Sequence, residues 1–336
     1  MVDQGSDVLH GSRFLITGGG GFIGSWIVKN LVYRGARPWV YDTGADSPRL
    51  RILLSDNQRA SVKSVRGDIR QLEDLDRAVA ENGITHLIHL AALQMPACAK
   101  DPLLGAHINV IGTMNVFEVA RRRRDVLKRV VYASSQGVYG PEELYGKDKI
   151  GEDAPLQPGT HYGVFKQANE GSARIYYSEH GVSSVGLRPG IVYGVGRDQG
   201  TTSAPTKAIK ATIAGRPYTI RFTGGLDLQY VKDVADIFLR CALIDIQGAT
   251  AYTIRGTVVQ MNEFLVALTS LLPRAKHLIC VEGRPFPVAY DFDNSPLGRA
   301  IGNLPFTPLQ EGIFETARIF ERLLIEGRLE TKDLEE

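Results

Sequence analysis

Cysteine is scarce in this sequence, with three residues among 336, at positions 98, 241 and 280. They form no C-x-x-C pair, and an odd number cannot all pair within the chain, so the sequence excludes a disulfide framework. A reducing compartment fits this usage best. The first residues, MVDQGSDVLHG, also lack the basic and apolar regions of a secretory signal. We therefore expect a cytoplasmic protein.

Long apolar runs and an excess of charge of one sign are absent as well. No uninterrupted apolar stretch approaches the roughly 18 residues that span a bilayer. The net charge of +2 provides no strong field toward nucleic acid or an anionic membrane. The basic run Arg121–Arg124 follows an apolar helical pattern, where cations complement the helix dipole, although a binding patch is the alternative. Because no H-E-x-x-H or clustered Cys/His set occurs, we also predict no metal site.

What remains is the composition of a globular protein, with 43% hydrophobic and 23% charged residues. From residue 13 to about 190, short apolar runs alternate with longer helical patterns. Strands are expected at 13–17, 39–42, 62–66, 86–90, 129–134 and 182–188, and helices at 25–34, 72–80, 108–122 and 162–180. Continuous apolar strands separated by helices are typical of a parallel sheet covered on both faces. The predicted fold class is therefore α/β, a doubly wound parallel sheet of the Rossmann type.

The rhythm changes after Gly194, where glycine and proline become frequent. Helical patterns at 204–214, 231–243, 261–271 and 308–326 no longer alternate cleanly with strands. We predict a dinucleotide-binding domain over residues 1–190 and a smaller substrate-binding lobe over 191–336, interleaved with the first.

The segment TGGGGFIG, residues 17–24, follows the first expected strand and precedes the first expected helix. Gly18, Gly21 and Gly24 have G-x-x-G-x-x-G spacing. Glycine permits the tight turn and the close approach of a pyrophosphate to the backbone, and the helix N-terminus supplies N–H groups. This placement predicts a bound dinucleotide. Asp42, at the end of the second strand, can accept hydrogen bonds from the adenosine ribose, which favours NAD over NADP; a turn-starting role is the alternative.

Several motifs, in this order, make the chain resemble the extended short-chain dehydrogenases/reductases, specifically the NAD-dependent epimerase/dehydratase family. Beside TGGGGFIG these are Gly67–Ile69, His89–Ala92, NVIGT at 109–113, YASSQGVYG at 132–140, YGVFK at 162–166, LRPGIVYG at 187–194 and YVKDVA at 230–235. The resemblance spans residues 12 to 325. It implies further NAD contacts from Phe22, Ile23, Asp68, Ile69, Leu90, Ala91, Ala92, Asn109, Tyr162, Lys166, Pro189 and Ile191.

Tyr162 and Lys166, four residues apart on an expected helix, lie on one helix face. A neighbouring ammonium and the positive nicotinamide ring favour the phenolate, so Tyr162 is expected to have a lowered pKa and to act as general base. Tyr145 and Lys149 share this spacing but lie in a Gly- and Asp-punctuated loop. The resemblance implies that Ser135 bridges the substrate and Tyr162, with Ser134 as the alternative, and that Lys166 binds the nicotinamide ribose.

The substrate is less clearly indicated. Gln136 and Gly137 stand where 4,6-dehydratases of the family have an Asp-Glu pair, and Ile191 and Leu226 where nucleotide-sugar epimerases have an Asn and an Arg. Apolar residues can neither neutralise the charge of a buried diphosphate nor donate hydrogen bonds to it. Residues 197–206 look more like those of L-threonine dehydrogenase and its small-substrate relatives. The expected substrate contacts are Gln136, Thr201, Thr202 and Arg284; the two threonines have a helix N-cap as their alternative role.

The sequence therefore predicts an NAD-dependent oxidoreductase that transfers a hydride at a secondary hydroxyl of a small sugar-like or hydroxy-acid substrate. The alternative is a sugar or nucleotide-sugar epimerase with tightly bound NAD; a catalytically silent NAD-binding protein is a third hypothesis. The resemblance also implies a homodimer that pairs through the helices at 108–122 and 162–180. The first of these helices carries more apolar residues than one sheet-facing stripe needs.

Overall fold

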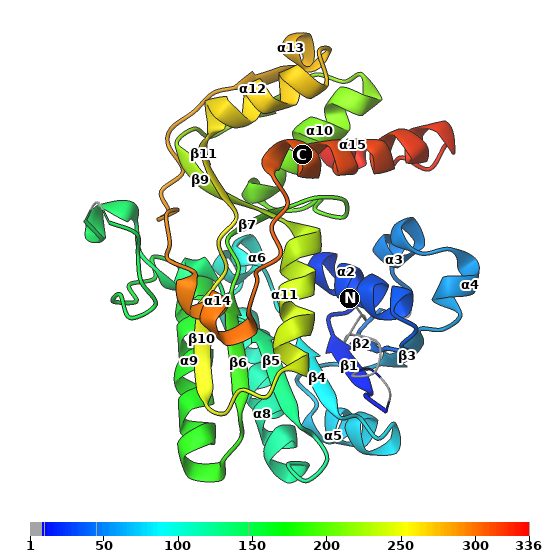
Figure 1. Ribbon diagram of the computed structural model, residues 1–336, viewed down its shortest axis with the longest axis vertical. Coiled ribbons are helices and arrows are strands. Elements are labelled where there is room, and N and C mark those ends of the chain that lie inside the picture. Colours follow the sequence, from blue (N-terminus) through cyan, green and yellow to red (C-terminus); the bar gives the residue numbers. More distant parts are fainter. Residues whose placement is uncertain (1–8, 10, 45, 147, 336) are drawn as a thin grey trace.

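A computed structural model describes residue 9 and residues 11–44, 46–146 and 148–335; most of the N-terminal segment assessed for a signal lies outside them. Seven parallel strands form the central sheet, in the order β10-β6-β5-β4-β1-β2-β3 (Figure 1). Their bounds are β1 Phe14–Thr17, β2 Trp39–Asp42, β3 Lys63–Arg66, β4 His86–His89, β5 Arg129–Ala133, β6 Ser184–Arg188 and β10 Ala249–Thr253. The order 3-2-1-4-5-6 of the first six is that of a Rossmann fold, which confirms the predicted fold class.

Helices cover both faces of this sheet. On one face lie α2 (Phe22–Tyr33) and α11 (Val231–Leu243), and on the other α5 (Leu72–Glu81), α8 (Gly112–Arg122) and α9 (His161–His180) (Figure 1). Alternate strand residues feed the two cores: Phe14 and Ile16 pack with α2 and α11, whereas Leu15 between them packs with α5 and α8. Two buried faces explain why the strands are continuously apolar.

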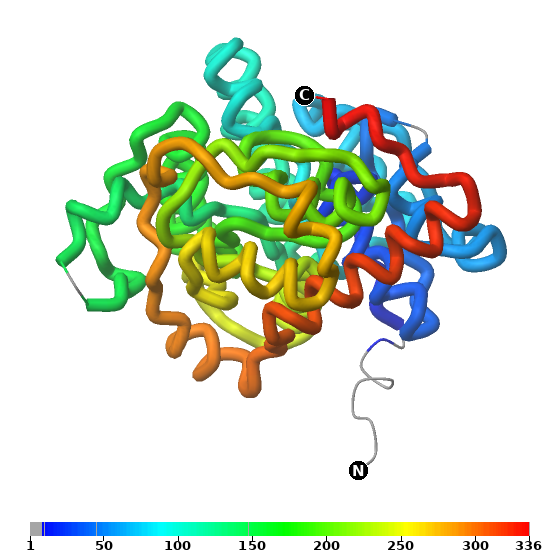
Figure 2. The backbone as a smooth tube through the Cα atoms, turned by 90° about the horizontal axis from the view of Figure 1, so that it is seen from above, coloured from blue at the N-terminus to red at the C-terminus, as the bar shows by residue number. Residues whose placement is uncertain are grey.

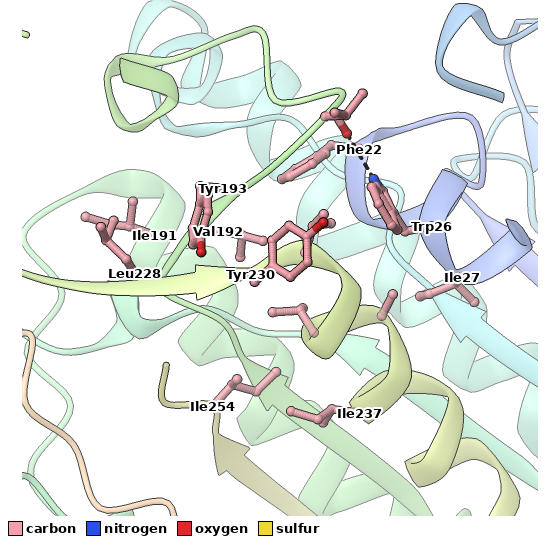
Figure 3. Close-up of a cluster of buried hydrophobic side chains, with 14 of the residues drawn as sticks. Phe22, Trp26, Ile27, Ile191, Val192, Tyr193, Leu228, Tyr230, Ile237 and Ile254 are labelled. Atoms are coloured by element: carbon pink, nitrogen blue, oxygen red, sulfur yellow. Dashed lines mark hydrogen bonds between the residues drawn. The ribbon is translucent and has the colours of Figure 1, made fainter. Parts of the chain in front are cut away.

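Residues beyond 190 contribute one strand to the central sheet and one helix to the layer that covers it. Strand β10 pairs with β6, with Thr253 opposite Arg188, and α11 packs on α2. Figure 3 shows the apolar cluster in which Trp26 of α2 meets Tyr193 and Tyr230 of the second part of the chain. The chain therefore leaves the sheet after β6, enters the lobe and returns to the sheet in β10.

The smaller lobe contains two small sheets and the remaining long helices. One sheet has the order β11-β9-β7, the other β12-β8. The elements are β7 Ile191–Tyr193, β8 Tyr218–Ile220, β9 Gly225–Tyr230, β11 Thr257–Gln260, β12 Ile279–Val281, α10 Ala204–Ala214, α12 Met261–Leu271, α13 Ala275–Leu278, α14 Ser295–Ile301 and α15 Leu309–Ile325. In the view from above, helices α12 and α15 of this lobe, coloured yellow and red, lie over the rest of the chain (Figure 2).

The helix expected to start at residue 108 starts six residues earlier. Helix α7 (Pro102–Ala106), a π-helical turn (His107–Ile111) and α8 form one continuous helix, Pro102–Arg122. Asp101 caps it by accepting a hydrogen bond from the Leu104 N–H at 2.9 Å, and Pro102 occupies the first turn. By length and composition alone, it is the one helix among the described residues that could cross a membrane. It packs against α5 and α9, and 44% of its most apolar stretch is buried.

Three further short helices border the site: α3 Pro48–Leu53, α4 Asp56–Arg59 and α6 Met95–Lys100. Their apolar patterns are too short for the 3.6-residue period to stand out. Ser47 and Ser55 cap the first two, and the Ser47 hydroxyl also donates to the Gly20 oxygen at 2.9 Å, which joins α3 to the glycine-rich turn.

Candidate active site

A cavity of about 1240 Å³ opens at the carboxyl ends of the sheet strands, below the lobe. This exceeds the roughly 300–1,000 Å³ of ordinary small-molecule sites, as a dinucleotide together with a substrate requires. The predicted site residues that line it are Gly18, Gly21, Phe22, Ile23, Gly24, Asp42, Asp68, Ile69, Leu90, Ala91, Ala92, Ser135, Gln136, Tyr162, Lys166, Pro189, Ile191, Thr201 and Thr202. Asn109 and Arg284 do not line it.

The glycine-rich turn fits a dinucleotide phosphate. Gly18 has a φ of +66°, and a Cβ there would lie 2.7 Å from the Ala91 nitrogen; a Cβ on Gly24 would lie 2.4 Å from the Gly18 oxygen. These two glycines are therefore required by the packing of the turn itself. Helix α2 begins with Gly21 as N-cap and no side-chain cap, so the N–H groups of its first turn remain available to an anion.

Asp42 lies at the end of β2, beside the glycine-rich turn. Its Oδ2 accepts a hydrogen bond from the Gly20 N–H at 3.2 Å, and its Oδ1 accepts one from the Thr43 N–H at 2.8 Å. The carboxylate is thus held against the glycine-rich turn, where it can meet a ribose diol. The turn-starting role and the ribose-binding role are compatible in this geometry.

Asn109 has a different position from the one expected of a cofactor contact. It is buried, and its amide is occupied by Leu93: Oδ1 accepts from the Leu93 N–H at 2.7 Å and Nδ2 donates to the Leu93 oxygen at 3.0 Å. Leu93 follows the cavity-lining residues Leu90–Ala92. Asn109 therefore holds the loop after β4 in place and does not itself reach the cavity.

Ser135, Tyr162 and Lys166 converge at the other end of the cavity. Ser135 follows β5, while Tyr162 and Lys166 lie one turn apart on α9, whose start is capped by Thr160 through the Gly163 N–H at 3.1 Å. The Lys166 Nζ lies 5.6 Å from the centroid of the Tyr162 ring and donates to the Ala133 oxygen at 2.6 Å. Both side chains therefore face the same part of the cavity, with the ammonium anchored to the end of β5.

Burial dominates the titration of this group of residues. It lowers the pKa of Lys166 to about 8. Burial also raises the pKa of Tyr162, while Ser135 and Arg197 act in the opposite direction. The lowering of the Tyr162 pKa expected from the sequence is thus not found in the protein alone. The Lys166 ammonium is directed to the Ala133 oxygen. The second cation expected to favour the phenolate belongs to the oxidised nicotinamide and not to the chain.

Ser134, the alternative to Ser135, is occupied elsewhere. It is buried, and its hydroxyl donates to Glu170, which forms a buried ion pair with Arg188 at 2.7 Å. The Ser135 Oγ accepts a hydrogen bond from the Gly137 N–H at 3.0 Å and is also close enough to hydrogen-bond the Tyr162 phenol. Ser135 is therefore the serine free to meet a substrate. The alternative pair fails too: Tyr145 lies in a loop and hydrogen-bonds Gly140 and Pro155, outside the cavity.

Gln136 is held by residues that the sequence did not single out. Its Nε2 donates to Asp227 at 2.7 Å and to the Ile254 oxygen at 2.9 Å, and Gln229 donates to the same two acceptors. Burial raises the pKa of Asp227 to about 6, against the donors that surround it. Asp227 lies in the run LDLQY, whose alternation of apolar and polar residues is typical of a half-exposed strand, so this pattern does not signal that Asp227 is buried.

Some of the remaining residues considered for substrate binding line the cavity and others do not. Thr201 and Thr202 form a 3₁₀ turn at the cavity wall, and neither caps α10, whose N-cap is Ser203 without a side-chain cap bond. Arg284 is exposed and outside the cavity lining, so the structure gives no support to it as a substrate contact. Ile191 lines the cavity, whereas Leu226 is fully buried in β9.

Comparison with known proteins agrees with this geometry. The family model described as "NAD dependent epimerase/dehydratase family" matches residues 14–250. A UDP-glucose 4-epimerase of Mycolicibacterium smegmatis is 32% identical over 234 residues, covering 68% of this chain and 72% of that one. The Thermus thermophilus UDP-glucose 4-epimerase, solved with NAD, has a TM-score of 0.77 and 28% identity over 92% of this chain and 98% of its own.

A likeness in fold alone extends to an L-threonine dehydrogenase from Cupriavidus necator, with a TM-score of 0.77 and 22% identity over 91% of this chain and 99% of that one. The family model covers more than half of the sequence, including the glycine-rich turn, Ser135, Tyr162 and Lys166. The chain belongs to the NAD-dependent epimerase/dehydratase family and is an NAD-dependent enzyme of the extended short-chain dehydrogenase/reductase type.

Proposed function

We propose that this enzyme oxidises a secondary hydroxyl of a small sugar-like or hydroxy-acid substrate to a ketone, or reduces the corresponding ketone to the hydroxyl. The observation that carries the proposal is the convergence of Ser135, Tyr162 and Lys166 on one end of a cavity whose other end has the glycine-rich turn. Bound NAD supplies the hydride acceptor at the nicotinamide ring. Gly18, Gly21 and Gly24 admit its diphosphate, and Asp42 accepts hydrogen bonds from its adenosine ribose.

Three side chains carry the proton chemistry. Ser135 donates its hydroxyl hydrogen to the substrate oxygen and holds it beside the phenol. Tyr162 removes the proton of the substrate hydroxyl as the carbon loses its hydride. In the reverse direction Tyr162 returns this proton to the substrate oxygen. Lys166, charged below a pKa of about 8, stabilises the phenolate that forms. The Ala133 oxygen fixes the position of that ammonium.

Two positions support a substrate without a nucleotide. Ile191 contributes an apolar wall, and Leu226 is buried in β9 away from the cavity, so neither can neutralise a diphosphate. The exposed Arg284 lies outside the cavity as well. The alternative, epimerisation of a nucleotide sugar with NAD retained, is favoured by the similarity to the UDP-glucose 4-epimerases.

Titration calorimetry separates the two substrate classes. The NAD-loaded enzyme is titrated with UDP and with UDP-glucose, and the formation of NADH from free sugars, aldonates and hydroxy acids is followed by absorbance. We expect no binding of UDP in the micromolar range and NADH formation with a small substrate. Micromolar binding of UDP would reject the small-substrate proposal in favour of epimerisation.

We also propose a cytoplasmic homodimer. Apolar side chains remain exposed on the two helices named for pairing: Leu103, Ile111 and Met114 on Pro102–Arg122, and Val164 and Ile175 on α9. Val116 and Phe117 of the same helix are fully buried. A second copy would cover the exposed stripes through a four-helix contact across a two-fold axis.

A further inference from the structure

Arg197 lies in the loop between β7 and α10, which forms one wall of the cavity. This loop is held in place from outside. The Trp26 Nε1 donates to the Val195 oxygen at 2.9 Å, the bond drawn in Figure 3, and the Arg49 Nε donates to the Gly196 oxygen at 2.9 Å. Because its backbone is fixed on both preceding residues, Arg197 presents its side chain to the cavity in a defined position.

The guanidinium group of Arg197 uses only part of its hydrogen-bonding capacity. Its Nη2 donates to the Thr202 Oγ1 at 2.7 Å, its Nη1 lies 3.5 Å from the Gln94 Oε1, and its carbon lies 5.9 Å from the Phe22 ring. Its Nε is buried and has no hydrogen-bond partner. A guanidinium carries five N–H donors, so one hydrogen on Nη1 and one on Nη2 remain for a ligand in the cavity that Arg197 lines.

The other arginines that line the cavity differ from Arg197 in their charge balance. Arg49 pairs with Asp198 at 2.6 Å, Arg70 with Asp68 at 2.5 Å, and Arg59 with Asp56. Over residues 11–44, 46–146 and 148–335, no carboxylate forms an ion pair with Arg197. The Asp198 carboxylate acts on Arg197 but is already paired with Arg49. Because Arg197 is partly buried and has no ion pair of its own, a ligand anion would stabilise it.

The place of this cation in the cavity indicates which ligand. Arg197 is close enough to Tyr162 for its charge to act on the phenol, and its contacts Thr202 and Gln94 also line the cavity. We propose that Arg197 binds a carboxylate of the substrate next to the reacting carbon, so that the substrate is a hydroxy acid such as an aldonate, with Thr202 and Gln94 fixing the guanidinium. This inference rests on the proposed hydride transfer at Tyr162.

The diphosphate of the dinucleotide is the other anion available in the cavity. The uncapped first turn of α2 and the glycine-rich turn already provide donors for it. The test must nevertheless separate the two anions, and it does so by measuring dinucleotide binding and acid binding on the same variants.

The experiment compares acids with alcohols of the same carbon chain on the NAD-loaded enzyme at constant ionic strength. Gluconate is paired with glucitol and glycerate with glycerol, and dissociation constants are measured by ligand-observed NMR titration. We expect at least one acid to bind about tenfold or more tightly than its alcohol, the effect of one charge-assisted hydrogen-bonded pair. Arg197→Met should abolish this preference, and Arg197→Lys should retain part of it.

The matched control is Arg221→Met, which removes a charge from a side chain that is 81% exposed and outside the cavity. It should keep both the acid preference and the dissociation constant of NAD. Arg197→Met should also leave the NAD constant unchanged; a tenfold weakening would assign Arg197 to the dinucleotide diphosphate and overturn the proposal. So would a wild-type enzyme that binds neither acid more tightly than its alcohol.

Failure of this inference is distinguishable from failure of the proposed function. If neutral alcohols form NADH and acids do not, the hydride-transfer proposal stands and the carboxylate proposal falls. If acids bind through Arg197 but no compound of either class forms NADH, the carboxylate site stands and the proposed chemistry falls.

Discussion

The Nε2 atom of Gln136 lies 2.7 Å from the Oδ2 atom of Asp227. This bond joins the loop after β5, which carries Ser135, to strand β9 of the lobe. Because Asp227 and the Ile254 oxygen are both acceptors, the Gln136 amide must turn its nitrogen inward. A Cβ on Gly190 would lie 2.0 Å from the Gln136 Oε1, so a side chain at position 190 would disturb this arrangement.

Asp227→Asn should change how stability depends on pH. Burial raises the pKa of Asp227 from 3.8 to about 6, so the folded state holds this proton more tightly than the unfolded state. The wild-type protein therefore loses stability from this group as the pH rises from about 4 to about 6, by at most about 3 kcal/mol. Urea unfolding at both ends of this range should show this loss relative to the variant, which has no carboxylate to titrate. A constant difference between the two proteins would contradict the raised pKa.

Lys166→Met should stabilise the cofactor-free protein while destroying its activity. The buried ammonium, with its pKa lowered from 10.5 to about 8, costs about 3 kcal/mol below pH 8. Loss of the bond to the Ala133 oxygen offsets about 1 kcal/mol of the gain. The advantage of the variant should shrink as the pH rises from 8 to 10.5, where the wild-type lysine is neutral in the fold. Denaturant melts at pH 7 and 10 test this, and a variant that is less stable at pH 7 would refute it.

Asp42→Ala should narrow the preference for NAD over NADP. The carboxylate, held by the N–H groups of Gly20 and Thr43, repels a 2′-phosphate and accepts from a ribose diol. Fluorescence titration with both reduced cofactors measures the ratio, which should fall by about tenfold, the value of one charged contact. The exposed Asp74→Ala serves as control and should leave the ratio intact. Equal affinity of the wild-type enzyme for both cofactors would remove the role of Asp42.

Met114→Glu should dissociate the proposed homodimer. Met114 is 39% exposed on the helix Pro102–Arg122, in the stripe that a second copy would cover, and a buried unpaired carboxylate is strongly unfavourable there. Val266→Glu, at a 63% exposed position on α12, should remain dimeric. Analytical ultracentrifugation at micromolar concentration distinguishes the two variants. A monomeric wild-type protein would contradict the proposal directly.

Much of the fold follows from local patterns in the sequence. The strand at 39–42 and the helices at 204–214, 231–243 and 261–271 have the predicted bounds. Pro38, Gly215 and Pro273 lie within two residues of an end of three of them, and the apolar period marks the helix at 231–243. Pairing of β10 with β6 is not visible in the same way, because 61 residues separate Arg188 from Ala249 and only tertiary contact brings them together. The start of the helix at Pro102 has a recognisable sequence signal, because Asp101 is a favourable N-cap residue and proline is favoured in the first turn.

At the site, the residues fixed by covalent spacing were predictable and those fixed by burial were not. Tyr162 and Lys166 share a helix face by geometry alone, whereas the direction of the Tyr162 pKa depends on how deeply α9 places it. The hydrogen bonds of the Asn109 amide to the Leu93 backbone likewise depend on the burial of Asn109 and not on its spacing in the sequence. The roles of Asp227 and Arg197 depend on the lobe folding back over the sheet, which no local pattern encodes.

The most direct test of the account is Tyr162→Phe, with turnover and NAD binding measured on the same preparation. The phenol oxygen transfers the proton and makes no expected contribution to cofactor affinity. The rate of NADH formation with the best substrate should fall by about 10²–10⁴-fold, as general-base loss usually costs, while the dissociation constant of NAD stays within about twofold. The control variant Tyr145→Phe, which changes the tyrosine of the other Y-x-x-x-K pair, should retain full activity. A Tyr162→Phe enzyme with more than about a hundredth of the wild-type rate would contradict the assignment.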